Sequence, residues 1–201
     1  MNIRTEIGII LLAAGASTRM GQPKQLLPFK GETLIRHTAK VALQTTCRPV
    51  VIVIPLNQPL FQKELEDLNV ILVESEDAAP GMSTSIHAGL VRMQVEAPQC
   101  LAILFLVVDQ PFINAAHLTN LVNASTESEK SIVASAYKDQ LGVPALFDKK
   151  WFPALMQLTG DQGARKLLKA YPDEVHAISF PEGAFDLDTP ENYDFLIAHF
   201  E

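Results

Sequence analysis

The fold is decided by residues 7–24, which read IGIILLAAGASTRMGQPK. The first six, 7–12, form a continuous apolar run that is too short to cross a membrane, so they predict a buried central strand. Residues 13–16 then carry almost no side chain, and backbone N–H groups in such a loop can approach an anion closely. Arg19 and Lys24 add the positive charge that a polyphosphate needs. The stretch therefore predicts a strand followed by a triphosphate-binding loop.

The same loop also has a simpler interpretation. Small residues after a strand form tight connections to a helix, and two basic residues can lie on any surface. The P-loop spacing G-x-x-x-x-G-K-[ST] and the dinucleotide spacing G-x-G-x-x-G are both missing from this stretch, so the mechanisms attached to those motifs do not apply. Taken alone, the loop leaves the nucleotide-binding and the structural interpretations open.

Composition limits the classes of protein and partner. The chain has 201 residues, of which 48% are hydrophobic and 19% charged, a globular balance that fits one domain with a full core. A net charge of −7 and a pI near 5.2 make nucleic acid and anionic membrane surfaces poor partners. Cys47 and Cys100 form no paired motif and predict reduced thiols, and no apolar run is long enough to span a bilayer. We expect a single domain, residues 1–201, in the cytoplasm.

Strand and helix patterns alternate along the first two thirds of the chain, which is typical of a parallel sheet covered by helices. Apolar runs predict strands at 7–12, 49–54, 70–73, 100–108, 131–137, 143–147 and 175–179. Helical periodicity predicts helices near 34–42, 61–68, 86–93, 114–123, 149–157, 163–170 and 190–200. A turn at 138–142 breaks the alternation and predicts a small antiparallel excursion in the C-terminal half. The fold class is therefore α/β with a mostly parallel sheet.

Two acidic segments could serve catalysis at the edge of this sheet. Ligands of open α/β sheets bind beyond the carboxyl ends of the strands, and Asp109 follows the most apolar strand, 100–108. A carboxylate there needs a cationic partner, which a Mg²⁺ ion bridging carboxylates and phosphates would supply. Asp186 and Asp188 alternate on an extended segment and so point the same way. The structural alternatives are a turn aspartate before Pro111 and charges that favour a helix N-terminus.

Three further polar stretches could contact ligands. Gly81 and Ser83 lie at a helix start, where free N–H groups and hydroxyls can hydrogen-bond a base or a ribose. The other two lie where the alternation breaks, and they contain Gly142, Pro144, Gly160, Asp161 and Arg165. A helix that begins near Arg165 could bind a phosphate. Ordinary turns and helix caps explain the same residues as well.

In combination, these segments resemble the molybdenum cofactor cytidylyltransferases and related MobA-like NTP transferases. The first loop matches the signature L-A-A/G-G-x-x-x-R-M-G-x-x-K, D-Q-P at 109–111 matches D-x-P, and 186–193 matches D-x-D-T-P-E-D-Y except at Asn192. The remaining matches are G-M-S-T-S at 81–85 with G-M-S-x-S, G-V-P at 142–144 with G-x-P, and G-D-Q-G-A-R at 160–165 with G-D-x-G-A-R. The resemblance spans 12–193.

The resemblance implies a Rossmann-like, three-layer nucleotidyltransferase fold and a set of site residues. Against the nucleotide it places Leu12, Ala13, Ala14, Gly15, Gly81 and Ser83. It gives catalytic roles to Arg19 on the β- and γ-phosphates, to Lys24 on the α-phosphate and to Asp109. It implies a Mg²⁺ ion held by Asp109 and Asp188, with Asp186 as the alternative second ligand. The acceptor would face Gly142, Pro144, Gly160, Asp161 and Arg165.

The reaction that the resemblance implies transfers CMP from CTP to the phosphate of molybdenum-bearing molybdopterin and releases pyrophosphate. Cytidylyl transfer is favoured because Ala14, D-Q-P and G-M-S are similar to the cytidylyl branch. Alternatives are guanylyl transfer, transfer to another phosphorylated small molecule and, in a different class, a nucleotide-binding regulator or chaperone of molybdoenzymes without turnover. A recipient molybdoenzyme is a further candidate partner. An oxidoreductase is disfavoured because no dinucleotide motif follows the first strand.

Overall fold

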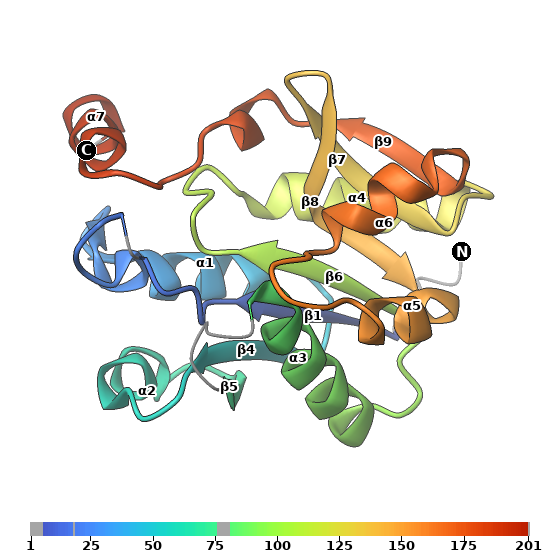
Figure 1. The fold of residues 1–201 in the computed structure, drawn as a ribbon, viewed down its shortest axis with the longest axis horizontal. Helices are drawn as coiled ribbons and strands as arrows, with labels where there is room; N and C mark the ends of the chain where they lie inside the picture. The colour runs from blue at the N-terminus through green and yellow to red at the C-terminus, as the bar shows by residue number, and fades with distance from the viewer. Residues whose placement is uncertain (1–5, 18, 76–80, 201) are drawn as a thin grey trace.

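The computed structural model describes residues 6–17, 19–75 and 81–200. Within these ranges, seven strands form one sheet in the order β5-β4-β1-β6-β8-β7-β9, which crosses the middle of the molecule (Figure 1). The strands are β1 (Ile7–Leu12), β4 (Val50–Pro55), β5 (Ile71–Ser75), β6 (Ala102–Val107), β7 (Ile132–Tyr137), β8 (Gln140–Asp148) and β9 (Val175–Ser179). A separate antiparallel ribbon consists of β2 (Pro28–Phe29) and β3 (Glu32–Thr33).

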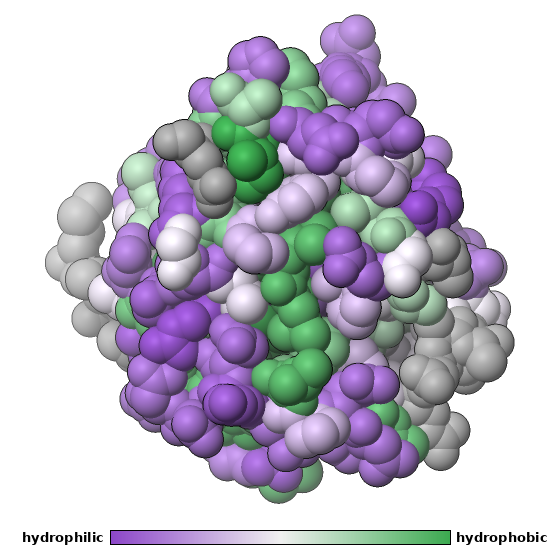
Figure 2. Space-filling view, turned by 90° about the vertical axis from the view of Figure 1, so that its left-hand side faces the viewer, coloured by the Kyte–Doolittle hydropathy of each residue, from purple (hydrophilic) through white to green (hydrophobic). Residues whose placement is uncertain are grey.

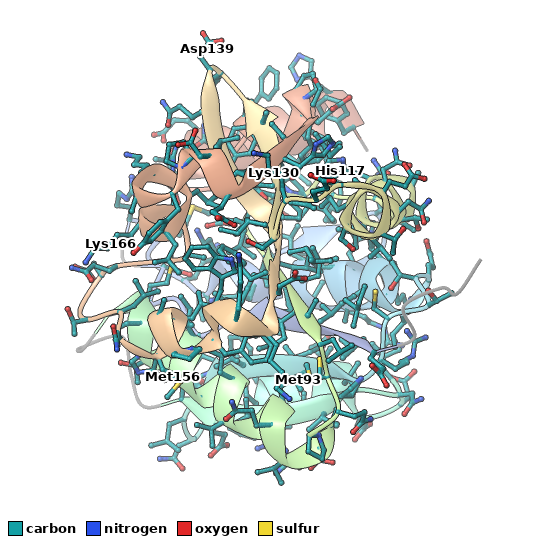
Figure 3. The ribbon with its side chains drawn as sticks, turned by 90° about the vertical axis from the view of Figure 1, so that its right-hand side faces the viewer. Met93, His117, Lys130, Asp139, Met156 and Lys166 are labelled. Carbon is teal, nitrogen blue, oxygen red and sulfur yellow. The ribbon has the colours of Figure 1, made fainter. Side chains whose placement is uncertain are left out.

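The seven-stranded sheet is parallel except for β8. β1 pairs in parallel with β4 and β6, and β7 with β9, whereas β8 runs antiparallel to both β6 and β7. Lys138 and Asp139 join β7 to β8 with φ angles of 47° and 57°, which suit a type I′ turn, and Asp139 lies at the hairpin tip (Figure 3). The predicted antiparallel excursion is therefore confirmed. β8 begins at Gln140 rather than 143 because this turn needs only two residues.

Helices cover both faces of the sheet and give the fold three layers. In β1, Ile9 and Leu11 point into one core and Ile10 into the other, as alternating strand side chains require. Side chains of α1, α2, α4 and α7 complete the first core, and those of α3, α5 and α6 complete the second. The three β1 side chains are fully buried, and each such burial contributes roughly 1.5–3 kcal/mol. The predicted three-layer α/β fold is confirmed.

The helices are α1 (Leu34–Leu43), α2 (Pro59–Leu65), α3 (Met82–Glu96), α4 (Ala115–Glu127), α5 (Phe152–Met156), α6 (Arg165–Ala170) and α7 (Pro190–Phe200). Short 3₁₀ turns are η1 (Lys24–Leu26), η2 (Lys149–Trp151), η3 (Pro172–Glu174) and η4 (Pro181–Ala184). α4 continues past the predicted end at 123 to Glu127, and in this last turn the hydroxyls of Ser125 and Thr126 donate to backbone carbonyls three residues earlier. None of the helices in the described ranges combines the length and hydropathy that a bilayer crossing requires.

His117 joins α4 to the sheet and makes stability depend on pH. Its Nε2 lies 2.8 Å from the Ser135 hydroxyl on β7, and its ring stacks on Phe180 at a centroid distance of 4.1 Å; the residue is labelled in Figure 3. Burial lowers the pKa of His117. As pH falls, the unfolded chain therefore takes up this proton first, at about pH 6.5, and the folded state loses stability below that pH.

We expect His117→Gln to lose less free energy of unfolding than the wild type when the pH is lowered from about 7.5 to about 5.5, across the His transition. Urea unfolding at both pH values measures this difference. His37, whose pKa burial also lowers, stays in both proteins and cancels in the comparison. Equal losses in the two proteins would contradict the assignment of this pH dependence to His117.

Candidate active site

The loop after β1 borders a cavity at the edge of the sheet where the parallel strands end. β4 and β5 lie on one side of β1 and β6 lies on the other, so this edge is the switch point at which open α/β sheets bind ligands. The cavity measures about 380 Å³, and its lining includes Leu12 from β1 and Val107 from β6. Figure 2 faces this edge of the molecule and shows a band of apolar surface between hydrophilic margins.

Gln25 holds the loop in shape. Its Nε2 donates to the carbonyl oxygens of Ala13 and Gly15 at 2.8 and 2.7 Å, and Ser17 Oγ donates to its Oε1 at 3.2 Å. The backbone N–H of Lys24 donates in turn to Ser17 Oγ at 3.1 Å. Gln25 is only 2% exposed, so water cannot readily replace these hydrogen bonds. One buried amide thus ties the start of the loop to its end.

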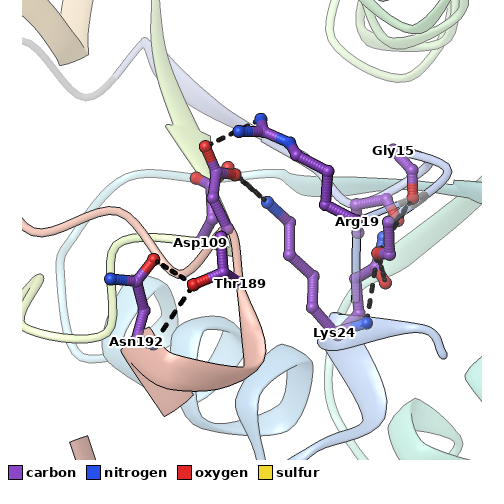
Figure 4. A network of polar contacts seen from close by, with 10 residues as sticks. Gly15, Arg19, Lys24, Asp109, Thr189 and Asn192 are labelled. Atoms are coloured by element: carbon purple, nitrogen blue, oxygen red, sulfur yellow. Dashed lines mark hydrogen bonds and ion pairs between the residues drawn. The ribbon is translucent and has the colours of Figure 1, made fainter. Parts of the chain in front are cut away.

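Lys24 gathers two carboxylates from distant parts of the chain into one cluster (Figure 4). Its Nζ lies 2.8 Å from Asp109 Oδ2 and 3.1 Å from Asp188 Oδ1, and Arg19 contacts Asp188 Oδ2 at 3.0 Å. Burial by itself lowers the pKa of Lys24, but the two carboxylates outweigh it and hold that pKa above its usual value. The side chain of Lys24 is 13% exposed and that of Arg19 is 69% exposed. Within this cluster, solvent therefore screens the ion pairs of Lys24 less than the ion pair of Arg19.

Backbone contacts place Asp188 beside Asp109. The carbonyl oxygen of Asp109 accepts a hydrogen bond of 2.8 Å from the N–H of Leu187, which is fully buried. Thr189 then caps α7, since its hydroxyl accepts from the N–H of Asn192 at 3.3 Å (Figure 4). Asp188 is thus fixed between a buried residue and a helix cap.

Asp186 has a different environment from Asp188. Among the described residues, Asp188 lines the cavity and Asp186 does not. Partial burial, followed by the negative charges of Asp109 and Asp188, raises the pKa of Asp186. The geometry therefore pairs Asp109 with Asp188 across Lys24 and leaves Asp186 outside that pair.

Another part of the cavity forms where the start of α3 meets the loop before α6. A Cβ at Gly81, where φ is +92°, would lie 2.3 Å from the carbonyl carbon of Gly160, so the contact requires glycine. Ser83 is 4% exposed, and its hydroxyl and N–H donate to the Gly160 carbonyl oxygen at 2.9 and 3.1 Å. Ser83 therefore holds this loop, while Ser85 lines the cavity.

The predicted site residues divide into two groups. Those that line the cavity are Leu12, Ala14, Gly15, Arg19, Lys24, Gly81, Asp109, Asp161 and Asp188. Those outside its lining, within the part of the chain that the structure describes, are Ala13, Ser83, Gly142, Pro144, Gly160 and Arg165. Gly142 and Pro144 are buried on β8, and Arg165 is exposed at the start of α6. The structure therefore brings the residues predicted for the nucleotide together more completely than those predicted for the acceptor.

The predicted site residues leave out Gln25, Met82 and Ser85, although the last two belong to the G-M-S-T-S segment at 81–85. Met82, which is 47% exposed, and Ser85 both line the cavity from α3. Their spacing of three residues places them on one helix face, a signal that could have connected them with the nearby loop. Gln25 offers no such signal, because its partners are backbone carbonyls that no side-chain pattern reveals.

The two carboxylates suit a divalent cation. One ammonium group contacts an oxygen atom of each, so a single cation in that position can be held by both. Carboxylate oxygens are preferred ligands of Mg²⁺, which commonly takes one or two of them and completes its shell with water and substrate phosphates. Within the described ranges, no cluster of three or more His, Cys, Asp or Glu side chains suits a metal, so the other ligands of a cation here would come from water and substrate.

A switch-point cavity that combines a small-residue loop, two cationic side chains and a pair of carboxylates has the groups that a nucleotidyltransferase needs to bind a nucleoside triphosphate and a divalent cation. The family model described as "MobA-like NTP transferase domain" matches residues 9–175 of the chain. The chain therefore belongs to the MobA-like NTP transferase family.

Two similar proteins extend over most of the chain, and a third covers a shorter part. Purine catabolism protein PucB of Bacillus subtilis (strain 168) is 32% identical, covering 93% of this chain and 94% of its own. Nicotine blue oxidoreductase of Paenarthrobacter nicotinovorans is also 32% identical, with coverage of 90% and 92%. Molybdenum cofactor cytidylyltransferase of Escherichia coli (strain K12) is 32% identical over a shorter match, 45% of this chain and 47% of its own.

Solved structures share the whole fold. An Rv0371c homologue from Mycobacterium sp. strain JC1 superimposes with a TM-score of 0.85 at 27% identity, covering 97% of this chain and 96% of that one. Rv0371C of Mycobacterium tuberculosis in complex with manganese gives a TM-score of 0.80 at 26% identity, with coverage of 96% and 99%. The structure of a similar protein thus contains manganese.

We expect Gln25→Ala to lower the free energy of unfolding by about 1–3 kcal/mol, because it removes a buried amide that satisfies two loop carbonyls. Chemical denaturation measures this loss, and nucleotide binding should weaken with it because the loop loses its shape. Gln22→Ala is the matched control, since Gln22 lies exposed in the same loop. Equal stability of the two variants would show that the amide does not hold the loop.

Proposed function

We propose that this protein transfers CMP from CTP to the phosphate of molybdenum-bearing molybdopterin with the help of Mg²⁺ and releases pyrophosphate. The observation that carries the proposal is the contact of one ammonium group, that of Lys24, with both Asp109 and Asp188 inside the switch-point cavity. Mg²⁺ held by these two carboxylates would neutralise and orient the α-phosphate. A cytoplasmic setting is part of the proposal, on the free and buried state of Cys47 and Cys100.

The chain's own residues would bind the triphosphate and stabilise the charge that develops on it. Backbone N–H groups of the loop around Gly15 would face the phosphates, with Arg19 on the β- and γ-phosphates. Lys24 would exchange its carboxylate partners for the α-phosphate. An acceptor oxygen then forms a bond to the α-phosphorus, the bond from that phosphorus to the bridging oxygen breaks, and pyrophosphate leaves with the electron pair. An anionic acceptor needs no protein nucleophile, so catalysis is positioning and charge stabilisation.

The acceptor is proposed to bind beside the loop before α6. Asp161 lines the cavity, Gly160 is held by Ser83, and the exposed guanidinium of Arg165 is available at the start of α6. A phosphorylated acceptor would find its counter-charge on Arg165. Gly142 and Pro144 are buried in β8. They would therefore influence acceptor binding indirectly, through the position of that strand.

The choice of CTP rests on Ala14 and on the D-Q-P and G-M-S segments, which are similar to the cytidylyl branch. We expect CTP with Mg²⁺ to raise the melting temperature more than GTP with Mg²⁺ at the same concentration, because a ligand stabilises the folded state more when its concentration exceeds its dissociation constant by a larger factor. Thermal-shift and calorimetric titrations with both nucleotides measure this preference. A clear preference for GTP would replace cytidylyl by guanylyl transfer and leave the reaction type unchanged.

The pair of carboxylates can be tested separately from Asp186. We expect Asp109→Asn and Asp188→Asn each to lower the rate of pyrophosphate release on the order of 100-fold, the cost of losing a charge-stabilising group. Asp186→Asn should keep most of the activity, because Asp186 lies outside the cavity lining. The reverse ranking of Asp186 and Asp188 would move the second ligand to Asp186.

Nucleotide binding without turnover is a second candidate, since Lys24 and Arg19 already neutralise Asp188 in the free protein. Such a protein would serve as a regulator or chaperone of molybdoenzymes. CTP binding with no pyrophosphate release, in the presence of Mg²⁺ and a phosphorylated pterin acceptor, would favour it.

The name of the P. nicotinovorans relative raises an oxidoreductase as a third outcome. The G-x-G-x-x-G motif of dinucleotide-binding proteins is missing after β1, which disfavours this activity. Oxidation of a nicotinamide cofactor without pyrophosphate release would favour it.

A further inference from the structure

Gln110, the residue after Asp109, lies at the centre of a buried polar network. It is 2% exposed, and its Nε2 donates to the hydroxyl of Tyr137 at 3.2 Å and to the carbonyl oxygen of Gly183 at 3.1 Å. The Tyr137 hydroxyl donates in turn to the carbonyl oxygen of Val143 at 3.2 Å. One amide therefore joins the loop after β6 to the β7–β8 hairpin and to η4.

Two glycines leave the space that Tyr137 occupies. A Cβ at Gly142 would lie 2.0 Å from the Tyr137 hydroxyl oxygen, and a Cβ at Gly183 would lie 2.9 Å from Cδ1 of its ring. These glycines belong to different elements, β8 and η4, and both border the Tyr137 side chain. A Cβ at Gly183 would also meet Cδ1 of Phe180, at 2.4 Å. The position of Tyr137 is therefore a tight steric fit, and the glycine of the G-V-P segment is accounted for by this contact.

The network fixes the segment that carries the second carboxylate. Gly183 is bound by the side chain of Gln110, and Leu187 is bound by the backbone carbonyl of Asp109 at 2.8 Å. Two adjacent residues thus hold the segment at two points, and Asp188 follows the second point directly. Without the Gln110 bonds the segment would keep the Leu187 bond, the ring contact of Phe185 with Phe112 and an exposed bond from Lys138 Nζ to the Ala184 carbonyl oxygen at 3.0 Å. It would lose its buried side-chain attachment, which would allow the Asp188 carboxylate to move relative to Asp109.

The side-chain oxygen of Gln110 indicates that this residue is not there for packing alone. Its Oε1 is buried and has no hydrogen-bond partner within the described part of the chain. A buried unpaired acceptor lowers stability, and an apolar side chain of similar length would avoid that cost. An amide is therefore a poor choice for packing alone, and its two donated hydrogen bonds are the feature that an apolar residue could not supply.

We propose that Gln110 and Tyr137 are positioning residues that hold the Asp188 carboxylate opposite Asp109, and that they thereby set the affinity of the site for a divalent cation. The inference rests on the proposed function in one respect, the use of these two carboxylates as cation ligands. Neither Gln110 nor Tyr137 lines the cavity within the described residues, so both act through the carboxylates.

The test measures Mn²⁺ binding, with the metal alone, by electron paramagnetic resonance of the free ion. Gln110→Met keeps the length of the side chain and removes both donors, and Tyr137→Phe keeps the ring and removes the hydroxyl. We expect Gln110→Met to weaken Mn²⁺ binding about tenfold, the usual effect of losing a group that orients a metal ligand, and Tyr137→Phe to weaken it less. Because both substitutions break one network, the double variant should fall short of the product of the two effects.

Ser131→Ala is the matched control, because Ser131 is also buried and hydrogen-bonded, to Trp151 and Glu174, but at the start of β7. It should bind Mn²⁺ like the wild type, and the melting temperature of every variant shows that it is folded. A folded Gln110→Met or Tyr137→Phe with wild-type Mn²⁺ affinity would overturn the inference, as would multiplicative effects in the double variant. Weakened Mn²⁺ binding in these variants, with no pyrophosphate release by the wild type, would support the inference and refute the proposed function.

Discussion

The site depends on one cation between two carboxylates. Asp109 and Asp188 lie 85 and 164 residues from Lys24 in the sequence, yet both contact its ammonium group. Two negative charges 4 Å apart repel each other by about 4 kcal/mol at the effective dielectric constant of a protein surface. The ammonium group of Lys24 between them offsets this repulsion. The loop after β1, the end of β6 and the segment before α7 must all be in place for that charge to reach them.

Much of this arrangement could be predicted from sequence because its parts are local. The apolar run at Ile7–Leu12 forms β1, and the run before Asp109 forms β6, so the carboxylate falls at the end of a central strand. Parallel strands end at the same edge of a sheet, which brings Asp109 near the loop with Arg19 and Lys24. The fold class, the layers and the antiparallel excursion follow from the same patterns. The roles of the individual site residues remain predictions.

The contacts that shape the site could not be predicted, because they join segments that no periodicity connects. Ser83 holds Gly160 rather than facing the cavity, although its position at a helix start suggested a ligand contact. Gly142 leaves room for the Tyr137 hydroxyl, a requirement visible only once the β7–β8 hairpin is formed. Gln25 bonds to carbonyl oxygens, and every residue type carries those. Sequence patterns report which face of an element is buried, and they do not report which neighbour it meets.

Asp109 and Gln110 show how the two halves of the site are joined. The carboxylate of Asp109 lies in the cavity against Lys24, while the amide of the next residue faces away, into the network of Tyr137 and Gly183. Both residues also hold the chain that leads to Asp188, one through its backbone and one through its side chain. The end of β6, Leu106 and Val107, is paired with β1, and the earlier part of the strand, 102–105, is also paired with β8. The position of Asp188 relative to Asp109 is therefore set from the end of β6 through this dipeptide.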